Sequence, residues 1–348
     1  MEMKKMFKKD ELESIVLDYM EEENIPGLAL GLVKDRKILY TNGFGVKNIN
    51  KDEKITEETI FHMASISKTF VATAIMQLYE RGKLDIYKPV IDYIPYFKLA
   101  DKRYKEITIQ QMLSHLSGMP DVEDYEWDNP QYDDNALERY VKSLDDIKLM
   151  WEPGEKFSYS NITYEILGDI ISKVSGMTFE KYMKENILNP LEMNNSTYLK
   201  QDVPKGSLVS PHIRNKSGEI EVSNIFPYNR IHGPSSTLYS NALEICNYII
   251  AYMNKGRYNG KEIFKEETYL KMIKPYKEIG RGNKKIGLGW FIENNGEDKD
   301  IKIMHSGEDI GFRSNLIIQP EAGKAIIVMS NYRCRGISAF SKTILDII

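Results

Sequence analysis

Apolar and polar residues follow a helical period near the start of the chain and then change to the pattern of strands. Apolar side chains recur on one helix face between about residues 10 and 23. The segments 28–34 and 37–41 have the length and apolar content of strands, and Asp35 and Arg36 lie between them. This order predicts a helix followed by a β-hairpin.

The middle of the chain is dominated by helical patterns. A helix is predicted over 65–81, where Gly82 supplies a stop signal. From about 85 to 260, helical periodicity alternates with loops rich in Pro, Asp and Asn. The acidic and aromatic segment 123–134 is expected to form a surface loop, and a role as a lid over a cleft is left open.

The C-terminal part returns to strands and ends in a helix. Short apolar runs bounded by turn residues predict strands over 289–293, 302–305, 314–319 and 324–329. The last residues, 336–348, follow a helical pattern. The short connections favour an antiparallel sheet, because parallel strands need longer crossovers.

Together these patterns predict an α+β fold of the α/β sandwich type, with an antiparallel sheet flanked by the N- and C-terminal helices. The sheet domain is expected to combine residues 1–84 with residues 261–348. A mainly helical domain is expected over 85–260. We expect the active site where the two domains meet.

Composition and charge exclude several classes of protein. The 348 residues are 42% hydrophobic and 28% charged, as is typical of a folded globular protein. The 47 basic and 51 acidic residues give a net charge of -4, so no nucleic-acid partner is predicted. The richest apolar run, 325–329, is too short for a membrane span. No signal peptide is visible, so a cytoplasmic location is expected, or an extracytoplasmic one if a leader has been removed.

Cysteines and histidines do not have the spacing of a disulfide framework or a metal site. The chain has two cysteines, Cys246 and Cys334, which form no CxxC pair. Its five histidines show no HExxH spacing. We therefore expect no metal site.

The first candidate for chemistry is Ser65-Ile66-Ser67-Lys68. On a helix, Ser65 and Lys68 share one face, with Cβ atoms about 5–6 Å apart. A serine hydroxyl is a weak nucleophile until a base takes its proton, and a lysine in a dry site can have its pKa lowered enough to help. The alternative is a capping serine beside a solvated lysine. The apolar residues on either side argue against this alternative, because they predict a buried helix. A charged lysine in a buried helix is costly unless it is paired and hydrogen-bonded.

A second candidate is Tyr159-Ser160-Asn161, which precedes an apolar helix. A tyrosine near a cationic lysine loses its proton more readily and can then act as a general base or relay. Asn161 offers a donor and an acceptor for a lysine or a substrate amide. This corner between a loop and a helix would let an active group project.

A third candidate is His305-Ser306-Gly307, at the end of a predicted strand. Glycine there lets a substrate lie close to the strand and bond to its backbone, although an ordinary turn has a similar composition. His115 is expected to be a buried structural histidine rather than a base.

The order of these segments resembles the serine β-lactamase and penicillin-binding protein superfamily. The similar branch holds class C β-lactamases, DD-peptidases, D-aminopeptidases and related esterases. The resemblance extends from about residue 25 to residue 331. The segments that carry it are Ile25-Pro26-Gly27, Gly43-Phe44-Gly45, 61–68, 113–118, 153–161, Leu238-Tyr239-Ser240, 287–290 and His305-Ser306-Gly307.

The resemblance implies a role for each catalytic candidate. Ser65 would be the acylated nucleophile, and Lys68 would accept its proton. Tyr159 would serve as general base and later as general acid, coupled to Lys68 as one unit. Asn161 would position the substrate and the lysine. No cofactor is implied.

The resemblance also implies a substrate-binding strand. His305, Ser306 and Gly307 would occupy the place of the family's Lys-Thr-Gly strand. The backbone N–H of Glu308 would complete an oxyanion hole with the backbone N–H of Ser65.

Departures from the family pattern bear on the substrate. His305 stands where β-lactamases usually carry lysine, and a mostly neutral histidine attracts a substrate carboxylate less strongly. Glu308 and Asp309 follow where relatives often have small residues. If either faces the cleft, we expect it to favour a free amine or a neutral substrate, unless Arg313 neutralises it.

The activity implied is that of a serine hydrolase acting on small molecules or peptides, namely D-residue peptides, esters or β-lactams. A penicillin-binding peptidase or amidase for D-residues, or a DD-carboxypeptidase, ranks first. A carboxylesterase and a class C-like β-lactamase are the alternatives within this class. Two further alternatives are a penicillin sensor without turnover and an inactive relative. The sequence gives no expectation for the oligomeric state.

Overall fold

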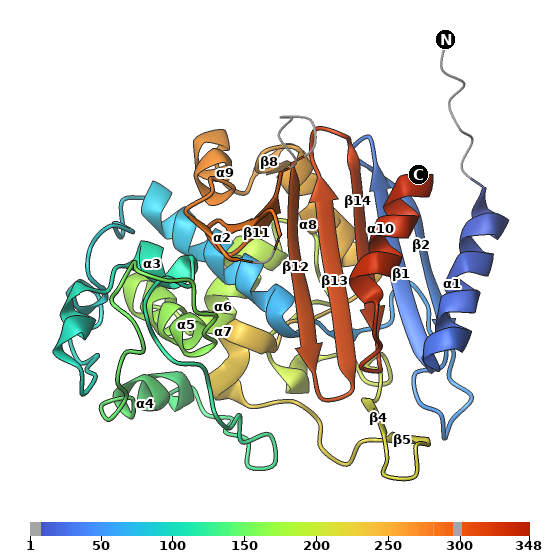
Figure 1. Ribbon diagram of the computed structural model, residues 1–348, viewed down its shortest axis with the longest axis horizontal. Coiled ribbons are helices and arrows are strands. Elements are labelled where there is room, and N and C mark those ends of the chain that lie inside the picture. The colour runs from blue at the N-terminus through green and yellow to red at the C-terminus, as the bar shows by residue number, and fades with distance from the viewer. Residues whose placement is uncertain (1–7, 281, 295–300) are drawn as a thin grey trace.

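An eight-stranded antiparallel sheet forms the centre of the molecule (Figure 1). The computed structural model describes residues 8–280, 282–294 and 301–348. The strands follow the order β2-β1-β14-β13-β12-β11-β10-β9. Their bounds are β1 Gly27–Lys34, β2 Lys37–Gly45, β9 Lys277–Glu278, β10 Lys284–Ile286, β11 Phe291–Glu293, β12 Lys302–Asp309, β13 Phe312–Gln319 and β14 Lys324–Ser330. Strands from both ends of the chain are neighbours, because β1 pairs with β14.

Helices cover the sheet and fill the space beside it. Their bounds are α1 Lys9–Glu23, α2 Ser67–Glu80, α3 Ile109–Leu113, α4 Ala136–Lys142, α5 Ile162–Ser175, α6 Phe179–Met183, α7 Gly233–Ser236, α8 Ala242–Met253, α9 Glu266–Met272 and α10 Ile337–Ile347. Single turns are η1 Ala64–Ile66, η2 Val90–Asp92, η3 Lys102–Glu106, η4 Lys184–Leu188, η5 Lys200–Asp202 and η6 Arg230–His232. Short strand pairs are β3 Phe61–His62 with β6 Tyr239–Ser240, β4 His212–Arg214 with β5 Ile220–Val222, and β7 Arg257–Tyr258 with β8 Lys261–Glu262.

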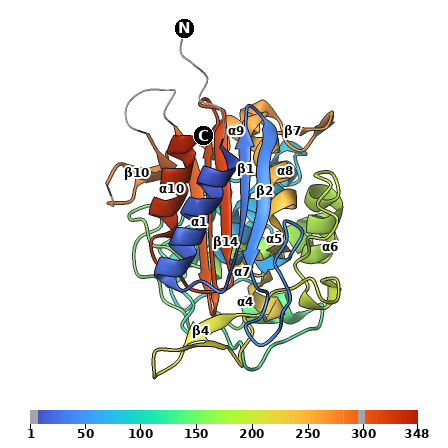
Figure 2. The same ribbon diagram turned by 90° about the vertical axis from the view of Figure 1, so that its right-hand side faces the viewer.

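Both faces of the sheet are buried, and the alternation of side chains along β1 produces this. Leu30 packs in a core with α1 and α10, whereas Ala29 belongs to the larger core with α2 and α8. Successive side chains of a strand point to opposite faces, so one strand serves both cores. Figure 2 shows α1 and α10 side by side on one face, where the rings of Tyr19 and Phe340 stack with centroids 4.1 Å apart.

Helix α5 is the centre of the helical part. It contacts α2, α3, α4, α6 and α7, and its first ten residues are all buried. Gly168 on α5 has no room for a side chain, because an added Cβ would lie 2.1 Å from Pro234 Cγ on α7. The close approach of α5 to α7 and α2 is what brings distant segments of the sequence to one site.

The predicted fold class is confirmed: an antiparallel sheet from both ends of the chain carries the terminal helices. The strand predicted over 289–293 begins later, at Phe291, because Gly289 adopts a positive φ of 76° that does not fit a strand. Strands β9 and β10 were not predicted, since they are two and three residues long and polar.

The division of the chain at residues 84/85 and 260/261 stays a prediction. Helix α8 comes from the segment expected to be the helical domain, yet it packs on β1 and β14 of the sheet. Within the described ranges, no helix combines the length and apolar character needed to cross a membrane.

Candidate active site

Ser65 lies in a tight corner between β3 and α2. The turn η1 contains Ser65, and Ala64 before it has a positive φ of 49°, which is strained for a residue with a side chain. Hydrogen bonds hold that residue on both sides. The Ala64 N–H donates to His62 Nδ1 at 3.2 Å, and the Ser67 hydroxyl donates to the Ala64 carbonyl at 2.6 Å. The position of the Ser65 hydroxyl is therefore fixed by its neighbours.

The central sheet supports this corner from below. The Ser314 hydroxyl on β13 donates to the Met63 carbonyl at 2.8 Å. Gly307 on β12 lies so close that an added Cβ would be 2.3 Å from that same carbonyl oxygen. Only glycine allows β12 to approach the serine corner this closely.

Lys68 is fully buried one turn after Ser65, and its amine makes three hydrogen bonds. Nζ donates to Ser65 Oγ at 3.1 Å, to Asn161 Oδ1 at 2.5 Å and to the Ser235 carbonyl at 2.7 Å. It also lies 5.1 Å from the centroid of the Tyr159 ring. The predicted pair of Ser65 and Lys68 and the predicted corner at 159–161 thus meet at one amine.

Burial lowers the pKa of the Lys68 amine to about 8. Three nearby carboxylates oppose this shift, because a negative charge stabilises the protonated amine. They are Glu165, Asp121 and Asp309. The amine therefore exchanges its proton within the physiological pH range rather than far above it.

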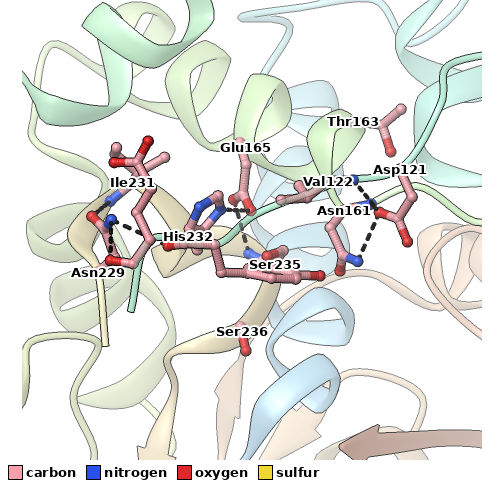
Figure 3. A network of polar contacts seen from close by, with 12 residues as sticks. Asp121, Val122, Asn161, Thr163, Glu165, Asn229, Ile231, His232, Ser235 and Ser236 are labelled. Carbon is pink, nitrogen blue, oxygen red and sulfur yellow. Dashed lines mark hydrogen bonds and ion pairs between the residues drawn. The ribbon is translucent and has the colours of Figure 1, made fainter. Parts of the chain in front are cut away.

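Tyr159 and Asn161 lie in the loop that enters α5. Asn161 is held by Asp121, whose Oδ1 accepts from the Asn161 N–H at 2.7 Å and from Nδ2 at 2.9 Å (Figure 3). The amide oxygen is left to face Lys68. Burial raises the pKa of the Tyr159 phenol above its ordinary value. A hydrogen bond with Ser65 offsets part of this rise. Tyr159 is therefore a protonated phenol at neutral pH.

His115 is buried, as predicted, and supports the tyrosine loop. Its ring stacks on Tyr159 with centroids 4.3 Å apart. Its Nδ1 accepts from the Ser160 N–H at 3.2 Å, and its carbonyl accepts from the Ser158 N–H at 2.9 Å. Burial and the nearby Lys68 charge lower the pKa of His115, so the ring stays neutral and keeps the lone pair that this contact uses.

The predicted substrate strand is the second half of β12. His305 is buried, its Nδ1 lies 2.9 Å from the Ser306 carbonyl, and burial next to Lys68 lowers its pKa to about 3. His305 is therefore neutral at physiological pH. The Ser306 side chain is exposed, and Gly307 contacts the serine corner.

The two acidic residues after the strand differ in their surroundings. Glu308 forms ion pairs with Arg313 and Arg333, so its charge is neutralised. Asp309 accepts a hydrogen bond from the Ser236 hydroxyl at 2.7 Å and from the Ile310 N–H at 3.0 Å. Burial raises the pKa of Asp309.

A cavity of about 610 Å³ adjoins this end of β12. Residues that line it include Glu123, Tyr125 and Trp127 from the predicted surface loop, together with Glu308 and Asp309. The rings of Tyr125 and Trp127 stack 4.8 Å apart. Four residues of the predicted loop, Glu123, Asp124, Tyr125 and Trp127, thus form part of the wall of a hollow at the C-terminal end of β12.

Sequence reasoning missed the residues that hold the site together. His62, Ser67, Asp121 and Ser314 fix the serine corner and Asn161 by one or two hydrogen bonds each, and the sequence predicted a role for none of them. Ser235 acts through its backbone carbonyl, which leaves no trace in the residue type.

A search for metal ligands among residues 8–280, 282–294 and 301–348 finds no cluster of three His, Cys, Asp or Glu side chains. Cys246 and Cys334 are both free and buried.

The sheet, its flanking helices and the Ser65 corner define a protein of the β-lactamase and transpeptidase-like class. The chain belongs to the beta-lactamase family, whose model matches residues 12–335.

Individual relatives share about a quarter of their residues with this chain. Protein flp of Staphylococcus aureus (strain MW2) is 26% identical over 324 residues, which are 92% of this chain but 62% of that protein. The chain thus spans less than two thirds of that relative's length. N-acetylmuramyl-L-alanine amidase of Bacillus subtilis (strain 168) is 27% identical over 290 residues, covering 72% of this chain and 65% of that protein.

Solved structures show the same fold. The octameric penicillin-binding protein homologue from Pyrococcus abyssi superposes with a TM-score of 0.84 and 29% identity, covering 98% of this chain and 77% of that one. The penicillin binding protein from Bacillus halodurans gives a TM-score of 0.82 and 25% identity, covering 97% of this chain and 100% of that one.

Proposed function

We propose that the protein is a serine hydrolase that forms an acyl-enzyme on Ser65. Its substrates would be D-residue peptides or amides, and it would be acylated by penicillin. The observation that carries the proposal is the contact between the Ser65 hydroxyl and the buried Lys68 amine. The amidase and the penicillin-binding protein homologues among its relatives support the same class.

In the proposed reaction, neutral Lys68 takes the proton of the Ser65 hydroxyl as its oxygen bonds to the substrate carbonyl carbon. The carbonyl π electrons move to oxygen, where the backbone N–H groups of Ser65 and Glu308 would stabilise the negative charge. The carbonyl then re-forms as the C–N bond breaks, and Tyr159 gives a proton to the leaving nitrogen while it takes one from protonated Lys68. Water then hydrolyses the ester on Ser65.

The pKa values favour Lys68 over Tyr159 as the first proton acceptor. An amine with a pKa of about 8 is neutral in roughly one molecule in ten at pH 7. The phenol of Tyr159 has a raised pKa and keeps its proton. Tyr159 is therefore better suited to relay a proton between Ser65 and the leaving group than to start the reaction.

We further propose a preference for substrates without a free carboxylate at the end that lies near β12. Neutral His305 gives little attraction for such a group, and Asp309 adds a carboxyl group that forms no ion pair among the described residues. The test is a steady-state comparison of D-aminoacyl amides with carboxylate-ended dipeptides. A higher kcat/KM on the dipeptides removes this preference.

The decisive experiment is intact-mass analysis after exposure to benzylpenicillin and to a fluorophosphonate. Wild type is expected to gain one equivalent of each reagent, and Ser65→Ala is expected to gain none while keeping the same thermal melting temperature. Absence of an adduct on wild type would contradict the proposal. A single burst of product followed by no turnover would identify a penicillin sensor, and rapid turnover of penicillin would identify a β-lactamase.

A further inference from the structure

The buried carboxylate of Glu165 is connected to Lys68 through one intervening residue, Ser235. Glu165 follows Asn161 by one turn of α5 and is 0% exposed. Its Oε2 accepts the Ser235 N–H at 3.2 Å, and its Oε1 lies 3.0 Å from His232 Nδ1 (Figure 3). Ser235 in turn presents its carbonyl to Lys68.

We propose that Glu165 is a positioning residue for Lys68, a role that rests on the proposed serine hydrolase reaction. Together with His232, it holds Ser235 so that the Ser235 carbonyl binds the amine. Its negative charge also sets how readily that amine gives up a proton. Two of the three acceptors around Lys68 would then depend on the start of α5, through Asn161 at its N-cap and Glu165 in its first turn.

The burial of Glu165 needs a reason of this kind. A carboxylate without water is costly unless it is paired and hydrogen-bonded. The residues on either side, Tyr164 and Ile166, are core residues, so an apolar side chain would suit this part of the helix. Glu165 instead makes polar contacts with the His232 ring and with the Ser235 backbone.

His232 is enclosed in a way that limits its own movement. Its ring is 2% exposed and meets three aromatic rings edge-on, at centroid distances between 4.8 and 5.5 Å. These rings belong to Tyr125, Trp127 and Tyr140. A clamped imidazole gives the Glu165 carboxylate a fixed partner, and this fixes its other oxygen against Ser235.

The same helix supplies a matched control. Asp169 lies one turn beyond Glu165, is 1% exposed, and accepts a hydrogen bond from Tyr96 OH at 2.5 Å. Asp169 is not among the carboxylates that influence Lys68. Neutralising it tests the effect of losing a buried charge on α5 without touching the site.

The sign of the expected effect follows from the charges that face Lys68. Glu165, Asp121 and Asp309 all favour the protonated amine. Other titratable groups that face it are neutral at physiological pH, namely His115, His305, Tyr159 and Tyr164. Removing one carboxylate destabilises the ammonium form, so the pKa of Lys68 falls and the neutral base appears at lower pH.

The experiment measures the second-order rate of acylation by benzylpenicillin against pH in wild type, Glu165→Gln and Asp169→Asn. In E165Q we expect the half-maximal rate at a pH lower by roughly one unit, and a maximal rate reduced by roughly tenfold or more. D169N is expected to match wild type in both respects.

Failure of this inference is distinguishable from failure of the proposed function. If wild type is not acylated at all, the serine hydrolase proposal is wrong. If wild type is acylated and E165Q keeps the wild-type half-maximal pH, or D169N shifts it equally, the role of Glu165 is wrong.

A second variant covers the case in which E165Q does not fold. His232→Gln keeps a side-chain donor for the Glu165 carboxylate and leaves its charge in place. We expect its maximal acylation rate to fall while its half-maximal pH does not. If the half-maximal pH of H232Q fell as far below the wild-type value as is expected for E165Q, the proposal would be overturned.

Discussion

The two halves of the candidate site are built differently. On one side, the Lys68 amine is buried and bonded to groups from η1, α7 and the loop before α5. On the other side, β12 contributes a neutral histidine, an exposed serine and a glycine. The Lys68 side is fixed by many polar contacts. The β12 side presents mainly backbone groups to a substrate and has few side chains that fill the space beside them.

This difference separates chemistry from recognition. A base must be held at one distance from the hydroxyl it deprotonates, so its side of the site tolerates little movement. A strand that binds substrate through its backbone allows varied side chains. We therefore expect changes near Lys68 to lower kcat, and changes along β12 to act mainly on KM and selectivity.

The largest expected effect comes from removing the base. Lys68→Met should lower the acylation rate by about 10³-fold or more, because nucleophile activation and proton transfer are both lost. The measurement is the rate of penicillin adduct formation by intact mass. Lys184→Met is the matched control, since Lys184 also has its amine bound to backbone carbonyls but lies in another region. Equal losses in both variants would contradict the role of Lys68.

The next effect tests the place where the two halves meet. In Gly307→Ala the added Cβ would lie 2.3 Å from the Met63 carbonyl, so β12 must move away from the serine corner. We expect kcat/KM to fall by about 10²-fold, since a displacement of this kind disturbs the reacting geometry. Wild-type kinetics in a folded G307A protein would show that β12 does not depend on close contact with the corner.

A moderate effect is expected at His305. His305→Gln replaces one neutral group with another, so kcat should change by less than about threefold while KM changes more. The half-maximal pH of acylation, expected near the Lys68 pKa of about 8, should stay in place because His305 is already deprotonated above its pKa of about 3. A shifted half-maximal pH would assign the titration to His305.

The smallest effect concerns the arginines that neutralise Glu308. Arg333 is 69% exposed, so Arg333→Gln should change the free energy of unfolding by less than about 1 kcal/mol. The Glu308 charge, then balanced by Arg313 alone, should raise KM for carboxylate-ended substrates relative to neutral ones. Added salt should weaken this selectivity, because it screens exposed charges. An unchanged KM ratio at low salt would show that Glu308 does not face the substrate.

The sequence predicted the fold better than it predicted the residues that hold the candidate site in place. Continuous apolar runs in β1 and β14 and the helical period near both ends carry enough information for a sheet that is buried on both faces. The pairing of Ser65 with Lys68 follows from helical spacing alone, and their contact with Asn161 agrees with the family resemblance.

The remaining supports could not be predicted, for physical reasons. Ser235 and Met63 act through backbone carbonyls, whose positions depend on the fold and not on side-chain type. Glu165 and His232 are 67 residues apart in the sequence, and no spacing rule connects them. The ion pairs of Glu308 depend on the register of β12 against β13, which places Arg313 directly opposite.

The pairing of β1 with β14 has a consequence for the order in which the protein is made. Leu28 is opposite Ser330, so during synthesis the β1 edge of the first hairpin stays unpaired until β14 has left the ribosome. The hydroxyl of Ser314 that supports the Met63 carbonyl arrives equally late. A nascent chain that lacks β13 and β14 therefore contains Ser65 but not the strands that support its corner, so the candidate site is complete only after β1 and β14 have paired.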